Sequence, residues 1–178
     1  MIIFALYTGQ RLGDIATLNW EQVEFESCEI RLTTQKTSRQ QKIPILAPLL
    51  RHIEKVNSKQ IRSGSIHPKA DSIYEAQRRT GTLSRQFSEI MAKAGITEKK
   101  SHQKQKEGEG RAARRTASKV SFHSLRHTTT SLLKNAGVSS AIAEEFVGHD
   151  SAEMNRVYTH IEQSSMKRAA DTLPDVVS

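Results

Sequence analysis

The sequence predicts a mainly α-helical protein with a small antiparallel β-sheet, which is an α+β fold. Over 82–94, apolar residues recur at helical spacing and fall on one face of a helix. From residue 26, by contrast, Cys28, Ile30 and Leu32 alternate with polar residues, as in a half-buried strand. At 178 residues the chain has the size of one domain, large enough to bury about two thirds of the surface that its unfolded form exposes.

The predicted helices follow the apolar periodicity. They cover 1–7, 10–19, 47–58, 82–94, 124–136, a short segment from Ser139 to Gly148, a last helix from Ser151 that presents Tyr158, and a weakly amphipathic segment over 162–173. The expected buried faces are Leu49, Leu50, Ile53 and Val56 in 47–58, and Leu83, Phe87, Ile90, Met91 and Ala94 in 82–94, with Thr82 as N-cap. The segment 59–79 has no clear pattern and contains Gly64 and Pro68, so we expect mainly a loop there.

A β-hairpin is predicted between residues 26 and 45. The polar turn over 36–40 separates the alternating strand from a second strand, 42–45. Pro44 favours an edge position for that second strand, because proline cannot donate a hydrogen bond to a ladder. The hairpin carries three basic residues at and near its tip, namely Lys36, Arg39 and Lys42. A basic tip of this kind either binds a phosphate-bearing partner or is simply solvated.

The overall charge favours a polyanionic partner. Lysine and arginine outnumber aspartate and glutamate by 27 to 19, a net charge of +8. Cys28 is the only cysteine, which excludes an internal disulfide and a multi-cysteine metal site and favours a cytoplasmic environment. No apolar run approaches the roughly 18 residues that a membrane span needs, so no membrane partner is expected.

The segment 97–119 differs in composition from its surroundings. It holds eight Lys or Arg against three Glu, a net +5, and no aliphatic residue larger than alanine. Such a segment cannot bury enough apolar surface to offset its ordering entropy. We expect a mobile basic insert, which either settles on DNA or remains solvated.

The stretch from Val120 to Ile161 contains a set of side chains suited to attack on a phosphodiester. His123 and Arg126 lie three apart on one helical face, and His149 and Tyr158 follow. A phenol has a reference pKa near 10, so only ~0.1% is ionised at pH 7. Nearby cations lower that pKa, and a neutral imidazole can accept the proton. Tyr158 is therefore the predicted nucleophile, with His123 and His149 as proton and hydrogen-bond partners.

The remaining roles fall to residues earlier in the chain. Arg11 and Arg126 are predicted to hold the non-bridging oxygens, because a planar guanidinium can contact two oxygens at once. Asp14, three residues after Arg11, could brace that guanidinium. Lys36 is the predicted general acid for the leaving 5′ oxygen, with Lys42 on the same hairpin as the alternative. Each residue taken singly could be structural or solvated, and the combination carries the hypothesis.

A zinc site is the rival interpretation of this stretch, since His123 and His127 stand at i and i+4. The helical zinc motif requires a glutamate directly after its first histidine, and Ser124 occupies that position. Arg126 between the histidines would repel a dication. The sequence therefore predicts no metal ligands.

Four sequence boxes resemble those of the tyrosine recombinases, the phage integrase family. T-G-Q-R-L-G-D-I-A-T-L-N-W resembles the first arginine box, and T-Q-K-T-S-R-Q-Q-K-I-P-I resembles the hairpin that carries the catalytic lysine. H-S-L-R-H-T resembles the H-x-x-R box, and V-G-H-D-S-A-E-M-N-R-V-Y-T-H resembles the box with the nucleophile. The resemblance assigns catalytic roles to Arg11, Lys36, His123, Arg126, His149 and Tyr158, and a supporting role to Asp14.

The resemblance also implies a fold and a reaction. We expect the integrase catalytic-domain fold over 1–178, without its first helix and without the core-binding domain that precedes it in the family. The expected reaction forms a 3′-phosphotyrosyl intermediate without metal, ATP or other cofactor. Double-stranded DNA at an attachment site is the expected partner, contacted also by Arg39 and Lys42. The segment 162–178 is expected either to pack on a neighbouring protomer or to fold back when the protein is monomeric.

The leading functional hypothesis is a site-specific recombinase or integrase that cleaves and rejoins DNA. A type IB topoisomerase, which nicks and closes DNA with a similar set of residues, is one alternative. A DNA-binding remnant of a mobile element without catalysis is the other. A covalent adduct on a nicked duplex would separate a strand-cutting enzyme from the remnant.

Overall fold

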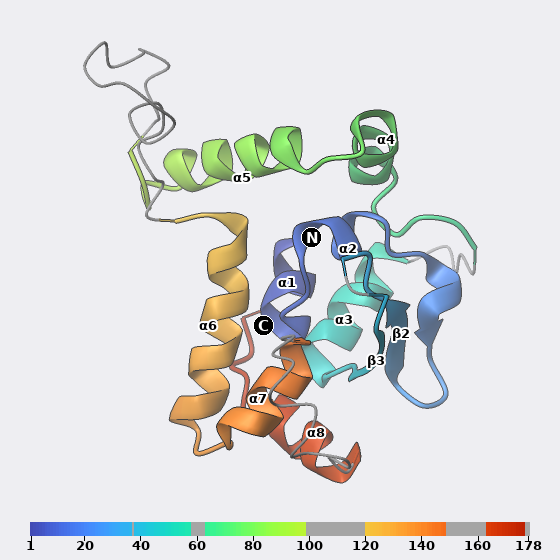
Figure 1. Ribbon diagram of the computed structural model, residues 1–178, viewed down its shortest axis with the longest axis vertical. Coiled ribbons are helices and arrows are strands. Elements are labelled where there is room, and N and C mark those ends of the chain that lie inside the picture. The colour runs from blue at the N-terminus through green and yellow to red at the C-terminus, as the bar shows by residue number, and fades with distance from the viewer. Residues whose placement is uncertain (37, 58–62, 99–119, 149–162, 177–178) are drawn as a thin grey trace.

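The predicted fold class is confirmed in a computed structural model of the chain (Figure 1). The structure describes residues 1–36, 38–57, 63–98, 120–148 and 163–176. Within these ranges the helices are α1 (Ile2–Thr8), α2 (Leu12–Ala16), α3 (Ala47–Val56), α4 (Pro68–Gln77), α5 (Gly81–Lys93), α6 (Phe122–Asn135), α7 (Ser140–Val147) and α8 (Gln163–Ala170), with a 3₁₀ helix at Trp20–Gln22. The strands are β1 (Val23–Glu24), β2 (Glu29–Thr33) and β3 (Gln40–Pro44).

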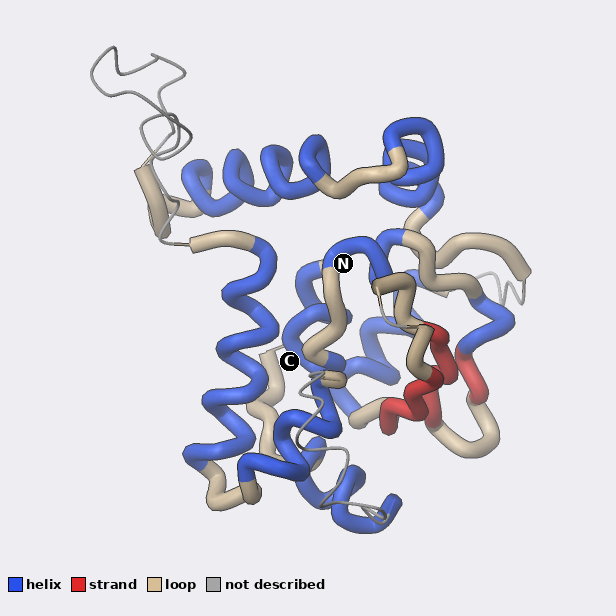
Figure 2. Tube along the Cα trace, viewed as in Figure 1, coloured by secondary structure: helices blue, strands red, loops and turns tan. Residues whose placement is uncertain are grey.

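The three strands form one antiparallel sheet in the order β1-β2-β3 (Figure 2). The predicted hairpin is β2–β3, in which Ile30 lies opposite Ile43 and Leu32 opposite Gln41. Pro44 ends the edge strand β3, which confirms its predicted edge position. The short strand β1 was not predicted, because two residues are too few to show alternation.

The hydrophobic core lies where α1 meets α3, α6 and the inner face of the sheet (Figure 1). Its fully buried apolar side chains include Phe4, Ile30, Ile43, Leu49, Ile53, Leu133 and Phe146. Helix α7 packs between α6 and α8, and α8 also contacts β3. Helices α4 and α5 lie at the other end of the molecule, where Ala16, Ala70 and Leu83 form a second, small apolar cluster.

The largest error of the sequence analysis lies in the segment 59–79. Helix α4 occupies Pro68–Gln77, where a loop was predicted. Pro68 stands in the first turn of this helix, a position that proline suits because the first helical N–H groups have no intrahelical acceptor. Only Ala70 is buried in α4, so the segment lacks the apolar stripe by which a helix is recognised.

Several predicted boundaries and buried positions also need correction. Helix α5 begins at Gly81 with Thr80 as its N-cap, not Thr82. Ile90 is 51% exposed and Ala94 is also exposed, because the end of α5 extends beyond the core. Val56, the last residue of α3, is 50% exposed. Helix α2 is shorter than the predicted 10–19.

The described part of the C-terminal segment folds back on its own chain. Met166, Ala169, Ala170 and Leu173 are buried, as their spacing predicted. Tyr7 donates a hydrogen bond to the carbonyl of Pro174 and accepts one from the N–H of Val176. Arg51 forms an ion pair with Asp175. Most of the predicted insert and all of the predicted helix with Tyr158 lie outside the described residues.

None of the helices in the described ranges is long and apolar enough to cross a lipid bilayer.

Candidate active site

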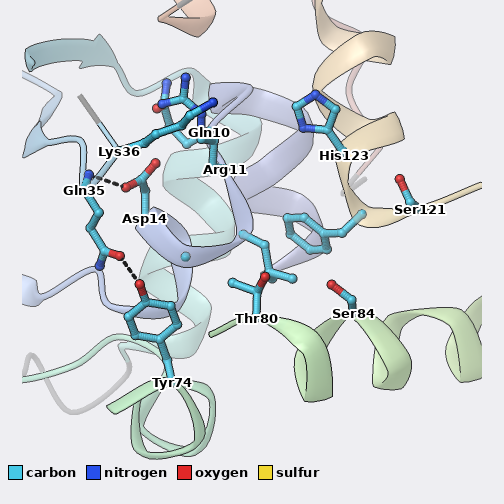
Figure 3. A pocket seen from close by; sticks show the side chains of 13 residues that line it. Gln10, Arg11, Asp14, Gln35, Lys36, Tyr74, Thr80, Ser84, Ser121 and His123 are labelled. Carbon is cyan, nitrogen blue, oxygen red and sulfur yellow. Dashed lines mark hydrogen bonds between the residues drawn. The ribbon is translucent and has the colours of Figure 1, made fainter. Parts of the chain in front are cut away.

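Three of the predicted catalytic residues line one hollow of about 430 Å³ (Figure 3). Arg11 comes from the start of α2, Lys36 from the β2–β3 turn and His123 from the first turn of α6. The other lining residues are Gln10, Leu12, Gly13, Asp14, Gln35, Tyr74, Thr80, Ser84, Ser121 and Phe122. The hollow therefore gathers three cationic or titratable side chains from three separate segments, of which the first and last, at Arg11 and His123, are more than 100 residues apart.

A sharp corner between α1 and α2 places Arg11 at the hollow. Gly9 ends α1 with a left-handed backbone, φ 65°, and Arg11 is the extended N-cap of α2. A Cβ on Gly9 would lie only 2.4 Å from Cγ1 of Val147. Glycine is thus needed here for its positive φ and for the close approach of α7.

Asp14 lies behind Arg11 and is 6% exposed. One of its carboxylate oxygens accepts a hydrogen bond from the N–H of Gln35, at 2.9 Å. Burial raises the pKa of Asp14, while this hydrogen bond and the positive charges of Arg11 and Arg126 oppose the rise. That Asp14 braces Arg11 stays a prediction. Its hydrogen bond to Gln35 links α2 to the turn that carries Lys36.

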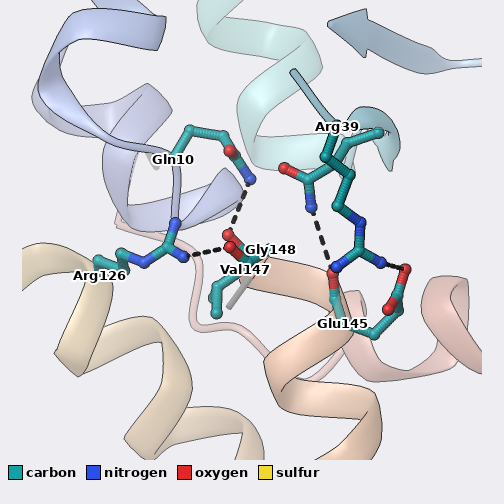
Figure 4. Close-up of polar contacts among 7 residues, drawn as sticks. Gln10, Arg39, Arg126, Glu145, Val147 and Gly148 are labelled. Atoms are coloured by element: carbon teal, nitrogen blue, oxygen red, sulfur yellow. Dashed lines mark hydrogen bonds and ion pairs between the residues drawn. The ribbon is translucent and has the colours of Figure 1, made fainter. Parts of the chain in front are cut away.

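Arg126 is buried, with 2% of its surface exposed, and it joins two glycine corners. The contact with one of them, Gly148, is drawn in Figure 4. The Arg126 guanidinium donates to the carbonyl oxygens of Gly9 and Gly148, each at 2.8 Å. Gly148 ends α7 with φ 72°, and a Cβ there would lie 2.4 Å from the side-chain amide of Gln41. Arg126 therefore ties the corner before Arg11 to the residue that directly precedes His149.

His123 is exposed at the hollow, so the H-x-x-R pair divides between surface and interior. The ring of His123 meets that of His127 edge to face, with centroids 4.7 Å apart. Partial burial lowers the pKa of His123, and the charges of His127, Arg126, Arg11 and Lys36 lower it further. The imidazole is consequently neutral at pH 7 and able to accept a proton.

His149 and Tyr158 lie outside the described residues. The described chain reaches Gly148, one residue before His149, and resumes after Tyr158 in α8.

Sequence comparison decides the family. A model of the phage integrase family matches residues 1–165. The chain belongs to the phage integrase family. Two curated relatives are similar to this integrase-family chain: tyrosine recombinase XerA of Pyrococcus furiosus, 26% identical over 96% of the chain, and a XerC-like tyrosine recombinase of Caldanaerobacter subterraneus, 22% identical over 99%. The chain spans about half of each relative, 53% and 49% respectively.

Solved structures agree on the fold. The integrase of mycobacterium phage Brujita matches 98% of the chain and 50% of its own length, with a TM-score of 0.66 and 19% identity. A XerA recombinase matches 94% of the chain and 53% of its own length, with a TM-score of 0.56 and 21% identity. The Tn1549 transposon integrase in complex with circular intermediate DNA matches 94% of the chain and 55% of its own length, with a TM-score of 0.50 and 15% identity.

Arg39 and Lys42, the two further residues predicted to contact DNA, have different surroundings in this integrase-family chain. Arg39 forms an ion pair with Glu145 on α7, and Gln41 donates to the carbonyl of Glu145 at 3.3 Å (Figure 4). Lys42 is exposed on β3, opposite Arg31 in the sheet. The structure thus separates the two lysines of the hairpin, since Lys36 lines the hollow and Lys42 points outward from the strand.

Sequence reasoning missed three residues that line the hollow of this integrase-family chain. Gln35 and Tyr74 line the hollow and hydrogen-bond to one another, and Gln10 donates to the carbonyls of Thr8 and Val147. Gln35 directly precedes Lys36, which was the one available signal. Tyr74 gave none, because its helix was predicted to be a loop.

Proposed function

We propose that this chain is the catalytic part of a site-specific recombinase that cleaves and rejoins DNA through a 3′-phosphotyrosyl intermediate. The observation that supports it best is the meeting of Arg11, Lys36 and His123 at one hollow, with Arg126 tied to the same corner. A scissile phosphate is the substrate group that this set of side chains suits.

The arginines supply the charge for the reaction. In the transition state, negative charge spreads over the non-bridging oxygens of the phosphate. Arg11, half-buried at the N-cap of α2, lines the hollow and can hold these oxygens. Arg126 is 2% exposed and does not line the hollow, so it contributes its positive charge from behind the Gly9 corner. The hydrogen bonds of Arg126 to Gly9 and Gly148 fix the plane of its guanidinium before substrate binds. A charge fixed in advance needs no rearrangement when the reaction occurs.

Two proton transfers accompany the exchange of oxygens at phosphorus. The bond from Tyr158 oxygen to phosphorus forms while the bond from phosphorus to the 5′ oxygen breaks. His123, neutral at pH 7, can accept or share the phenolic proton together with His149. Lys36 Nζ then donates a proton to the departing 5′ oxygen. Rejoining runs through the same steps in reverse, so the energy of the broken bond is retained in the phosphotyrosine.

Double-stranded DNA is the proposed partner. The net charge of +8 favours a polyanion, and a structural neighbour of this chain was solved as a DNA complex. We further propose that the protein self-associates on DNA and is monomeric without it, since the described part of the C-terminal segment is satisfied within its own chain.

The proposal is tested by trapping the covalent intermediate. Nicked suicide duplexes, tiled across the DNA that flanks the gene, are incubated with the protein and resolved on a denaturing gel. We expect an adduct with the wild type and none with Tyr158→Phe, because phenylalanine has no oxygen to attack phosphorus.

Tyr74→Phe is the matched control, because Tyr74 is a tyrosine that lines the hollow. This variant should still form the adduct. Loss of the adduct in Tyr74→Phe together with its retention in Tyr158→Phe would make Tyr74 the nucleophile. No adduct with the wild type on any duplex would contradict the proposed function.

A further inference from the structure

Gln35, the residue before the proposed general acid Lys36, makes hydrogen bonds beyond those that close the hairpin turn. The turn between β2 and β3 is closed locally, since Thr34 donates to the carbonyl of Arg39 and Ser38 donates to that of Thr34. Gln35 adds three further bonds that leave the hairpin. Its N–H donates to Asp14, and its side-chain amide donates to the hydroxyl of Thr17 at 2.8 Å. Its side-chain oxygen accepts the hydroxyl of Tyr74 (Figure 3).

The anchor for the last of these bonds is helix α4. The ring of Tyr74 packs on the small apolar cluster of Ala16, Ala70 and Leu83, so α4 and α2 fix its position from below. Its hydroxyl then reaches up to Gln35. A Cβ at Gly13 would lie in ordinary van der Waals contact with Gln35 and Tyr74, at 3.4 Å from each. A side chain larger than alanine at that position would therefore compete with both for space.

The direction in which Lys36 enters the hollow depends on the residue before it. Lysine has a flexible stem, and its ammonium must come within hydrogen-bond distance of the leaving oxygen to act as an acid. Burial fixes the turn at Thr34, which is 1% exposed, but Gln35 and Lys36 after it are exposed. The hydrogen bonds of Gln35 to α2 and α4 are what hold its backbone and side chain.

We propose that Tyr74 and Gln35 are positioning residues that align Lys36 for protonation of the leaving 5′ oxygen. This inference rests on the proposed function. Tyr74 itself touches no reacting atom in this scheme and acts through Gln35. We call the hydrogen-bonded pair of Tyr74 and Gln35 the clamp. Through it, α4 takes part in positioning the general acid, although α4 carries none of the predicted catalytic residues.

The test compares two leaving groups on the same duplex. One substrate has the ordinary 5′ bridging oxygen, and the other has sulfur there, which departs as a thiolate without needing a proton. With the oxygen substrate, we expect Tyr74→Phe to slow adduct formation about threefold to tenfold, the effect of one lost hydrogen bond. Gln35→Ala removes two side-chain hydrogen bonds and should slow it at least as much. With the sulfur substrate, both should match the wild type. DNA affinity should be unchanged in both variants.

Ser72→Ala is the control, because it also removes a hydroxyl from α4. The Ser72 hydroxyl is exposed and donates only within the helix, to the carbonyl of Pro68. This variant should cleave both substrates at the wild-type rate. An equal loss on both substrates, or no loss on either, in Tyr74→Phe would overturn the positioning role.

A second measurement does not depend on cleavage. Hydrogen exchange at the Gln35 amide, which is bonded to Asp14, should be faster in Tyr74→Phe than in the wild type and unchanged in Ser72→Ala. An unchanged exchange rate of the Gln35 amide in Tyr74→Phe would also overturn the proposed positioning role of Tyr74. If the wild type formed no adduct, the recombinase proposal would fail, while the exchange rates would still decide whether Tyr74 holds this turn.

Discussion

At the scale of single residues, the proposed site is built from groups whose environments differ sharply. Arg126 is buried and bound to two backbone carbonyls, whereas His123, three residues earlier on the same helix, is exposed. A single helical turn can therefore supply a fixed charge and an accessible base. Their division follows from helix geometry, because residues three apart are offset by about 60° around the axis, so one can face the core while the other lies at its edge.

His67 is a partly buried histidine outside the hollow, and it should make the fold sensitive to acid. Its ring meets Phe4 edge to face at 5.0 Å. Burial, and then the positive charges of the amino terminus and His52, lower the pKa of His67 to about 3. Because the folded pKa lies below the unfolded value, the unfolded chain binds more protons at low pH. Stability should be full above about pH 6.5 and fall below it, by at most about 1.4 kcal/mol per pH unit.

Urea unfolding on either side of that pH measures the effect. His67→Gln should show a smaller loss between about pH 7.5 and about pH 5 than the wild type, because it has no imidazole to protonate. His127→Gln, a change on the exposed surface of α6, should retain the wild-type loss. Equal acid sensitivity in His67→Gln and the wild type would assign the effect to other groups.

At the scale of helices and strands, the proposed site is formed by the ends of elements and not by their middles. The site is assembled from the corner after α1, the turn after β2, the start of α6 and the end of α7. Gly9 and Gly148 allow two of these ends to approach within van der Waals contact of Val147 and Gln41. The ion pair between Arg39 and Glu145 links the hairpin to α7 as well.

Gly9→Ala should therefore be more destabilising than the same replacement at a glycine that also has a positive φ but has no atoms close to the added methyl group. The new methyl would overlap the stiff, fully buried side chain of Val147 and would occupy a left-handed backbone. We expect a loss of about 2–4 kcal/mol in the free energy of unfolding.

Gly137→Ala is the comparison, since Gly137 has φ 83° and nothing within 4 Å of its added Cβ. It should lose only about 1–2 kcal/mol, the cost of the left-handed backbone. Equal losses in the two variants, measured by urea unfolding, would show that the contact with Val147 relaxes at no cost.

At the scale of the whole molecule, the C-terminal segment completes the core instead of trailing from it. Leu173 is 7% exposed, and the chain beyond it hydrogen-bonds to Tyr7 in α1. Leu173→Ala should lower the free energy of unfolding by about 2–4 kcal/mol, because it leaves a cavity in this core. Val176→Ala, a 50% exposed position on the same segment, should change it by less than about 0.5 kcal/mol.

The same experiment distinguishes folding back from exchange between copies. If the segment docks on its own chain, the unfolding midpoint of the wild type should not depend on protein concentration without DNA. A midpoint that rises with concentration would indicate that copies exchange this segment.

Sequence pattern by itself determined the parts of this protein that depend on neighbours in the chain. The apolar spacing of α5, α6 and α8, the hairpin alternation and the end of α7 at Gly148 are all local features, and the sequence placed the N-cap of α7 at Ser139 or Ser140, of which the structure has Ser139. The four family boxes likewise identified the candidate catalytic residues by order and spacing. Helix α4 was not predicted, because its apolar face is short and its periodicity is therefore weak.

Only the tertiary structure decided which of those residues meet and how each is held. Nothing in H-S-L-R-H-T indicates that Arg126 is buried on the carbonyls of Gly9 and Gly148. Nothing near Lys36 in the sequence points to Tyr74, almost forty residues later. Hydrogen bonds and steric contacts act over a few ångströms of space, whereas sequence patterns report only on residues within a few positions along the chain. The corners that bring distant segments within that range are therefore visible in the fold alone.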